Sequence, residues 1–194
     1  MTRSMSHTMS LELVIGPMFA GKSSAAVTRI RRANVLGWKS FVITSVLDTR
    51  YGNARSIQTH DKEGIPAVGL TSLKEAYTFG DFHAASLVIV EEAQFFPDLY
   101  EFVQMAVESY GKNVVIIGLD GDSDRKPFGH ILQLIPMADT VTKLSALCKR
   151  CGDGTAATFT ASVSRDAKSE QVCVGGSEMY EAMCRKHYTQ NIKR

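Results

Sequence analysis

The sequence predicts an α/β protein: one domain with a parallel β-sheet, followed by a smaller C-terminal unit. Short apolar runs alternate with segments of helical pattern through residues 11–146, which is typical of a parallel sheet wound with helices. A glycine-rich loop separates the first apolar run from the first helical segment. From Leu147 onward this alternation stops and two spaced Cys/His pairs appear, which indicates a separate unit.

The first element is a strand at Leu11–Ile15, which leads directly into a loop of the pattern G-x-x-x-x-G-K-[ST]. A helix is expected at 24–32. The glycines let backbone N–H groups surround a phosphate, and the helix points its positive end at the same place. A chance match in a glycine-rich turn is the alternative, but the flanking strand and helix favour a nucleoside-triphosphate site. The phosphate-binding candidates are Gly16, Pro17, Met18, Phe19, Ala20, Gly21, Lys22 and Ser23, of which Ser23 would hold Mg²⁺.

The remaining elements follow in the same alternation. Strands are expected at 38–45, 67–70, 87–90, 114–119 and 140–144, and helical segments at 72–77, 97–110 and 131–137. Ligands of such sheets bind beyond the C-terminal ends of the strands. We therefore expect the polar loops at 47–52 and 120–129 to lie near the phosphate site.

Two carboxylates, Glu91 and Glu92, follow the apolar strand at 87–90. An acid at this place in a phosphate-loop protein holds the metal or its water shell. Two adjacent carboxylates can also divide the work, one serving the metal and the other the proton of the nucleophile. The alternative is a pair of solvated carboxylates at the end of a strand.

The C-terminal unit carries Cys148-x-x-Cys151 and, further on, Cys184-x-x-His187. Two such pairs form a tetrahedral Zn²⁺ site, and four protein ligands make that site closed and structural. Buried free cysteines with a surface histidine are the alternative. Cys173 lies between the pairs and is expected to be an unliganded thiol. The expected organisation is a tail at 1–10, a nucleotide-binding domain at 11–146, a metal-binding domain at 147–188 and a tail at 189–194.

Composition limits the other possibilities. The chain has 194 residues with a formal net charge of +2, whereas a protein that binds nucleic acid is usually more basic. No apolar stretch is long enough to span a membrane, and residues 1–10 lack the apolar core of a secretory signal. A cytoplasmic location is therefore expected, in which the four cysteines favour metal binding over disulfides.

Taken together, the motifs make the chain resemble the cytosolic, type II thymidine kinase family. The matching segments are G-P-M-F-A-G-K-S at 16–23, D-T-R-Y at 48–51, T-H-D at 59–61, E-A-Q-F-F-P-D at 92–98, L-D-G at 119–121, R-K-P-F-G at 125–129, V-G-G at 174–176 and C-R-K-H-Y at 184–188. The resemblance implies a RecA-like P-loop domain and a zinc-ribbon-like domain that carries a lasso loop. It also implies transfer of the γ-phosphoryl group of ATP, with Mg²⁺, to the 5′-hydroxyl of thymidine or deoxyuridine in nucleotide salvage.

The resemblance also implies roles for individual residues. Glu92 matches the general base. The positions matched to the ATP phosphates, beyond the loop itself, are Asp48, Arg50, Glu91 and Gln94. The positions matched to the nucleoside are Met18, Phe95, Leu119, Phe128, Thr160, Val172, Val174, Gly175, Gly176 and Tyr180. Feedback inhibition by dTTP and assembly into a homotetramer or dimer are further implications.

This sequence departs from the family pattern in three places. Glu91 stands where the family usually has Asp, and Ser123 stands where an aromatic residue is often found. The segment after Cys151 is one residue longer than expected, so Thr160 is assigned by best fit. From the residues alone, a plain turn is the favoured interpretation of Gly175 and Gly176.

Two other functions fit part of the sequence. An ATPase acting on nucleic acid would use the metal-binding unit as a finger, but it would need a strongly basic surface and further motor motifs. A nucleotide-binding regulatory module with a zinc-ribbon docking surface would leave Glu92 and the D-T-R-Y loop unexplained.

Overall fold

A six-stranded sheet forms the centre of the computed structural model, which describes residues 9–48, 56–58, 64–163 and 176–192. All neighbouring strands in it are parallel, and their order is β5-β2-β6-β7-β1-β8. The strands are β1 (Ser10–Ile15), β2 (Ser40–Ser45), β5 (Val68–Leu70), β6 (Leu87–Val90), β7 (Asn113–Gly118) and β8 (Thr140–Lys143). Ile15, the last residue of β1, pairs with Gly118 of β7 and Lys143 of β8. The loops that leave these three strands therefore start at the same edge of the sheet, which confirms the expected fold class.

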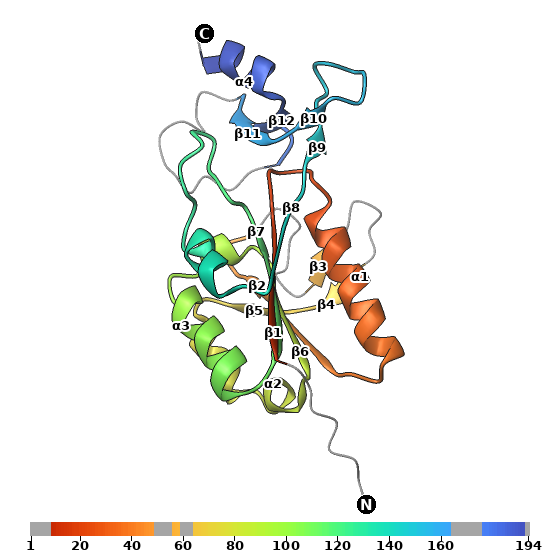
Figure 1. Ribbon diagram of the computed structural model, residues 1–194, viewed down its shortest axis with the longest axis vertical. Helices are drawn as coiled ribbons and strands as arrows, with labels where there is room; N and C mark the ends of the chain where they lie inside the picture. The colour runs from red at the N-terminus through yellow and green to blue at the C-terminus, as the bar shows by residue number, and fades with distance from the viewer. Residues whose placement is uncertain (1–8, 49–55, 59–63, 164–175, 193–194) are drawn as a thin grey trace, which may run out of the picture.

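Helices cover both faces of the sheet (Figure 1). Helix α1 (Lys22–Val35) lies on one face, and α2 (Gly80–Ala84) and α3 (Leu99–Gln104) lie on the other. The shorter helical segments are the 3-10 helices η1 (Leu73–Thr78), η2 (Ala93–Phe95) and η4 (Ile131–Met137) and the π-helical turn η3 (Met105–Ser109).

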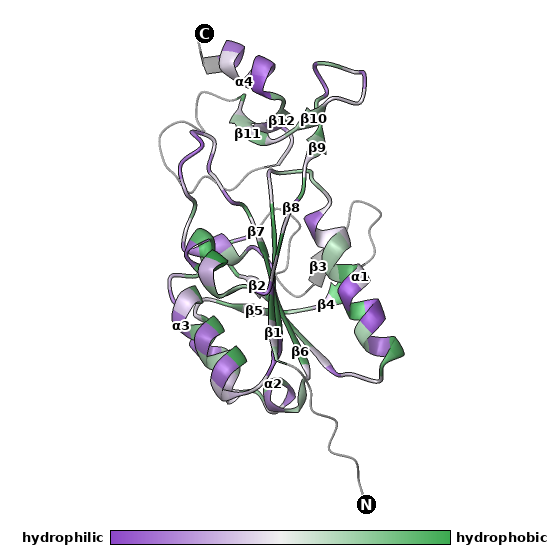
Figure 2. Cartoon of the chain, in the orientation of Figure 1, coloured by the Kyte–Doolittle hydropathy of each residue, from purple (hydrophilic) through white to green (hydrophobic). Residues whose placement is uncertain are grey.

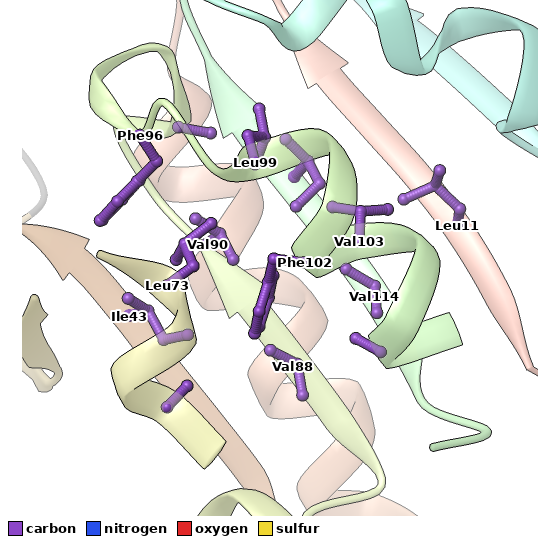
Figure 3. Close-up of a cluster of buried hydrophobic side chains, with 14 of the residues drawn as sticks. Leu11, Ile43, Leu73, Val88, Val90, Phe96, Leu99, Phe102, Val103 and Val114 are labelled. Atoms are coloured by element: carbon purple, nitrogen blue, oxygen red, sulfur yellow. The ribbon is translucent and has the colours of Figure 1, made fainter. Parts of the chain in front are cut away.

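Alternate residues of β1, β2, β6 and β7 pack into two separate cores. Leu11 and Leu13 of β1 pack into the larger core with α3, whereas Val14 packs into the smaller core with α1. Figure 3 shows Phe102 and Val103 of α3 lying over the strands of the larger core. Because both faces are covered, the central strands are mostly hydrophobic, as Figure 2 shows by their green colour.

Some elements differ from the sequence expectation. The helix expected at 97–110 begins at Leu99 and ends in the π-helical turn, in which the Tyr110 N–H donates to the Met105 carbonyl at 3.0 Å. Helix α2 and the hairpin of β3 (Ser56–Gln58) and β4 (Gly64–Pro66) were not expected. These elements are too short to show a hydrophobic period.

The C-terminal unit is built from two short antiparallel pairs and one helix. Its elements are β9 (Ala146–Leu147), β10 (Ala156–Ala157), β11 (Phe159–Ser162), β12 (Tyr180–Met183) and α4 (Arg185–Ile192). Residues 189–192, expected as part of a tail, belong to α4 instead. The Asn191 side chain donates to the Ser162 carbonyl at 3.1 Å, which ties this end of the helix to β11. In the part of the chain that the structure describes, no helix has the length and apolar character needed to cross a membrane.

Candidate active site and metal centre

The glycine-rich loop lies between β1 and α1, at the sheet edge where β1, β7 and β8 end. Gly16 has φ 146° and a Cβ there would lie 2.5 Å from the Leu144 carbonyl oxygen, so only glycine fits. Gly21 has φ 76°, and α1 begins at the next residue, Lys22. The Lys22 ammonium donates to the Pro17 carbonyl at 2.7 Å, which holds the side chain across the loop. With Ser23 half-buried in the first turn, this arrangement can hold a triphosphate and a metal ion.

The two carboxylates after β6 differ in their surroundings. Glu91 is buried, and its N–H donates to the Ile43 carbonyl at 2.9 Å, which continues the pairing of β6 with β2. Glu92 is half-buried and has φ 51°, a left-handed conformation that costs a non-glycine residue energy and is common at functional sites. The Glu92 carboxylate accepts a hydrogen bond at 2.6 Å from the side-chain amide of Gln94. The two acids therefore have different environments, as a division of roles requires.

Five apolar residues expected around the nucleoside lie together in one buried cluster. They come from the phosphate loop, η2, the end of β7, the loop that follows it and β12: Met18, Phe95, Leu119, Phe128 and Tyr180. The rings of Phe95 and Phe128 meet edge to face, with centroids 5.7 Å apart and an interplanar angle of 87°. Such a cluster next to the phosphate loop can accept the flat, apolar faces of a nucleobase.

Thr160 lies beside this cluster, on β11. Its hydroxyl accepts a hydrogen bond at 3.0 Å from the backbone N–H of Met18, and both residues are buried. The position assigned by best fit therefore contacts the phosphate loop.

Other expected site residues lie at the borders of the described chain or beyond it. Asp48 follows β2, and its N–H donates to the Ser45 carbonyl at 3.1 Å. The Gly176 N–H donates to the Glu178 carboxylate at 2.6 Å, and the Gly176 carbonyl accepts from Met179 and Tyr180, which forms a turn before β12. Four expected residues fall outside the described residues: Arg50, Val172, Val174 and Gly175.

The four expected metal ligands converge in the C-terminal unit. The ligand atoms of Cys148, Cys151, Cys184 and His187 all lie within 4.8 Å of one another. The His187 Nδ1 is 3.4 Å from each of the three sulfur atoms, and the Cys151 and Cys184 sulfur atoms are 3.7 Å apart. Zn²⁺ at ordinary bond lengths in a tetrahedral Cys₃His site requires separations of roughly 3.6 Å for S to N and roughly 3.8 Å for S to S. The residues therefore fit Zn²⁺.

The thiols of the ligand set interact with one another. Burial would raise the pKa of the Cys148 thiol, but hydrogen bonds, the largest from the backbone of Cys184, lower this pKa to about 6, whereas burial raises the pKa of the neighbouring Cys151 thiol to about 11. Cys148 is therefore the thiol that most readily forms the thiolate, which is the form that binds metal. The loop after Cys148 closes because the N–H groups of Cys151 and Gly152 donate to the Cys148 carbonyl at 3.1 and 3.2 Å.

Two side chains connect the metal centre to the loop that carries Phe128. The Tyr188 hydroxyl donates to the Ser123 carbonyl at 2.5 Å. The Arg125 guanidinium lies 4.6 Å from the centroid of the Tyr188 ring, within the range of a cation–π contact. Tyr188 follows the ligand His187 directly, so the metal centre helps to place the loop at 120–129.

A cavity of about 200 Å³ next to the phosphate loop was not predicted from the sequence. Pro17, Asp120, Arg125, Lys143 and Thr160 are among the residues that line it. The Lys143 ammonium pairs with the Asp120 carboxylate at 2.6 Å. Lys143 is the last residue of β8, the strand next to β1. This position could have indicated the cavity, but only to a reader who already knew the order of the strands.

Comparisons with known proteins show which family the chain is similar to. The model of the family described as "Thymidine kinase" matches residues 9–188. Thymidine kinase a of Arabidopsis thaliana is 39% identical over 185 residues, which cover 94% of this chain and 76% of the relative. The thymidine kinase of Variola virus is 40% identical over 181 residues, covering 92% of this chain and 96% of the relative. That of Vaccinia virus, strain Western Reserve, is 38% identical over 179 residues, covering 92% and 96%.

Proposed function

The chain belongs to the thymidine kinase family, and from this premise we propose how its residues carry out the reaction. The enzyme is a thymidine kinase, so a phosphoryl group passes from ATP to thymidine. In the proposed reaction Glu92 accepts the proton of the 5′-hydroxyl. The 5′-oxygen forms a bond to the γ-phosphorus as the bond from that phosphorus to the β,γ-bridging oxygen breaks, giving dTMP and ADP.

The position of Glu92 carries this proposal. The residue follows the C-terminal end of β6. In the sheet, β7 alone separates β6 from β1, the strand that leads into the phosphate loop. Its left-handed backbone and its hydrogen bond from Gln94 hold a carboxylate at the sheet edge to which the apolar cluster also belongs. A positioned carboxylate that can accept the proton of the 5′-hydroxyl is what the reaction needs.

The triphosphate would be held by the loop from Gly16 to Ser23, with Lys22 on the outer phosphates. Mg²⁺ would be held by the Ser23 hydroxyl and by Glu91, either directly or through water. The metal neutralises charge on the phosphates when bound. Asp48 and Arg50 are proposed to lie near the transferred phosphate.

The thymine ring is proposed to bind in the apolar cluster, with Thr160 at its edge. The lasso residues Val172, Val174, Gly175 and Gly176 would contact the base through their backbones. Deoxyuridine lacks only the methyl group of thymidine, and an apolar pocket discriminates weakly against one missing methyl. We therefore expect both nucleosides to be substrates.

The zinc centre is proposed to be structural, because all four of its ligands come from the protein. By family resemblance we also propose a cytoplasmic enzyme that assembles as a homotetramer and is inhibited by dTTP.

The test is ATP-dependent phosphorylation of thymidine, deoxyuridine, deoxycytidine and deoxyguanosine in parallel. Product from the first two alone supports the proposed pocket, whereas no product despite ATP binding contradicts the proposal. Glu92→Gln should lower kcat by about 10²- to 10⁴-fold, the usual contribution of a general base, while ATP binding is retained. A variant that keeps most of its turnover would exclude Glu92 as the base.

A further inference from the structure

We propose that Gln94 is the positioning residue for Glu92, and that it links the orientation of the base to the wall of the nucleoside pocket. The proposal rests on the assignment of Glu92 as the general base. The family resemblance placed Gln94 with the ATP phosphates, but its contacts point elsewhere.

Both ends of the Gln94 side-chain amide are bonded inside the protein. Its nitrogen donates to the Glu92 carboxylate at 2.6 Å, and its oxygen accepts from the Leu119 backbone N–H at 3.1 Å. Flipping the amide would place a donor against the Leu119 N–H and an acceptor against the carboxylate, so only one orientation satisfies both partners. The residue is 4% exposed. A buried amide that is bonded in this way is suited to orient Glu92 rather than to contact a triphosphate.

Gln94 packs against two glycines, where a side chain would collide with it. A Cβ on Gly118 would lie 2.5 Å from the Gln94 amide oxygen. A Cβ on Gly129, which has φ 59°, would lie 2.3 Å from the Gln94 backbone oxygen. A side chain at Gly118 would displace the Gln94 amide, and one at Gly129 would displace the Gln94 backbone, so both glycines are needed for Gln94 to lie where it does.

The hydrogen bond to Leu119 gives the arrangement its functional meaning. Leu119 belongs to the apolar cluster proposed for thymine, and Glu92 is the proposed base. A glutamate side chain has three rotatable torsions, which its backbone alone does not fix. A bond from a rigid, buried donor selects one orientation, and that donor is itself held by the pocket wall. The Glu92 carboxylate is thus held at a fixed position relative to the proposed nucleoside pocket.

The test combines single and double variants. Gln94→Glu can still accept from Leu119 but sets a second carboxylate against Glu92, and Gln94→Met removes both hydrogen bonds without a buried charge. Each should lower kcat by about 10- to 100-fold, part of the contribution of a general base, and change the KM for ATP by less than about threefold. The matched control is Gln133→Glu on the exposed surface of η4, which should leave kcat unchanged. Thermal unfolding checks that each variant is folded.

The double variants separate positioning from a general structural role. In a Glu92→Gln background, either Gln94 substitution should change the residual kcat by less than about twofold, because residues that act as a unit are not additive. The same loss in both backgrounds would overturn the proposal, as would a kcat within twofold of wild type in both single variants. A higher KM for ATP with kcat intact would place Gln94 on the triphosphate instead. If Glu92→Gln alone keeps most of the turnover, the assignment of the base itself fails, and the single variant shows this without the doubles.

Discussion

The backbone N–H of Met18 in the phosphate loop donates to the Thr160 hydroxyl on β11 at 3.0 Å, across 142 positions of sequence. This bond joins the two parts of the chain directly. One partner belongs to the loop that would hold ATP, and the other to a strand pair that leads to the metal centre. The hydroxyl is therefore a direct link between the phosphate loop and the C-terminal unit.

Thr160→Val keeps the shape of the side chain but leaves the Met18 N–H without its acceptor. An unsatisfied buried donor costs about 1–3 kcal/mol, so the free energy of unfolding measured in urea should fall by that amount. The KM for thymidine should rise as the loop shifts. Thr160→Ser keeps the hydroxyl and should restore both values to near wild type. Equal losses in the two variants would show that the methyl group, not the hydrogen bond, is what matters.

Asp98, the residue before α3, is hydrogen-bonded to the start of η1. Its contribution to the stability of the fold should depend on pH. Its carboxylate accepts from the Ser72 hydroxyl at 2.5 Å and from the backbone N–H groups of Leu73 and Lys74 at 3.2 and 3.1 Å. Burial acts to raise the pKa of Asp98, but these hydrogen bonds outweigh it and hold the pKa below its ordinary value.

Because the folded pKa is depressed, the stabilisation from Asp98 is complete above the unfolded pKa of about 3.9 and is lost as the pH falls through the folded value. Asp98→Asn should therefore be less stable than wild type at neutral pH, with a difference that shrinks below about pH 4. Urea unfolding at a series of pH values measures this. A difference that stays constant down to about pH 2 would contradict the linkage.

Each chain should bind one zinc ion through Cys148, Cys151, Cys184 and His187. Cys184→Ser should lose the metal and lower the melting temperature, because metal binding supplies folding energy to a unit with little core of its own. Cys173→Ser is the matched control and should keep the metal, since Cys173 is expected to be unliganded. Atomic absorption on the purified proteins gives the zinc content. Loss of zinc in the control, or full retention in Cys184→Ser, would refute the ligand assignment.

The contact of Arg125 with Tyr188 should affect the nucleoside more than ATP. The loop at 120–129 carries Phe128 and contacts the metal-binding unit at Tyr188 and, through Arg125, at Phe159. Tyr188→Phe removes the hydrogen bond to Ser123 and keeps the ring. Arg125→Ala removes the cation–π contacts with Tyr188 and Phe159, each worth about 0.5–2 kcal/mol. Both should raise the KM for thymidine with little change in the KM for ATP. Parallel rises in both KM values would indicate general loosening instead.

The features that the sequence predicted are those with local signals. The loop at Gly16–Ser23, the acids after β6 and the Cys/His pairs each depend on short spacings, and all lie where they were expected. The apolar cluster of Met18, Phe95, Leu119, Phe128 and Tyr180 could be named only through family resemblance, because its members come from five distant segments.

The features that were missed depend on pairings between distant segments. The hydrogen bond from Met18 to Thr160, the pair of Lys143 with Asp120 and the hydrogen bond from Leu119 to Gln94 all join segments that are far apart in the sequence. Nothing in a single segment carries that information. The hairpin of β3 and β4 lacks a hydrophobic period, and its formation depends on pairing rather than on local propensity.

The strand order also has a consequence for how the protein is made. Among the strands that the structure describes, β1 comes first in the chain, yet the partners it has there are β7 and β8, whose paired residues come more than a hundred positions later. The strand that carries the phosphate loop therefore has no partner until most of the nucleotide-binding domain has left the ribosome. During synthesis the ATP site is the last part of the sheet to be completed, although its motif is the first to emerge.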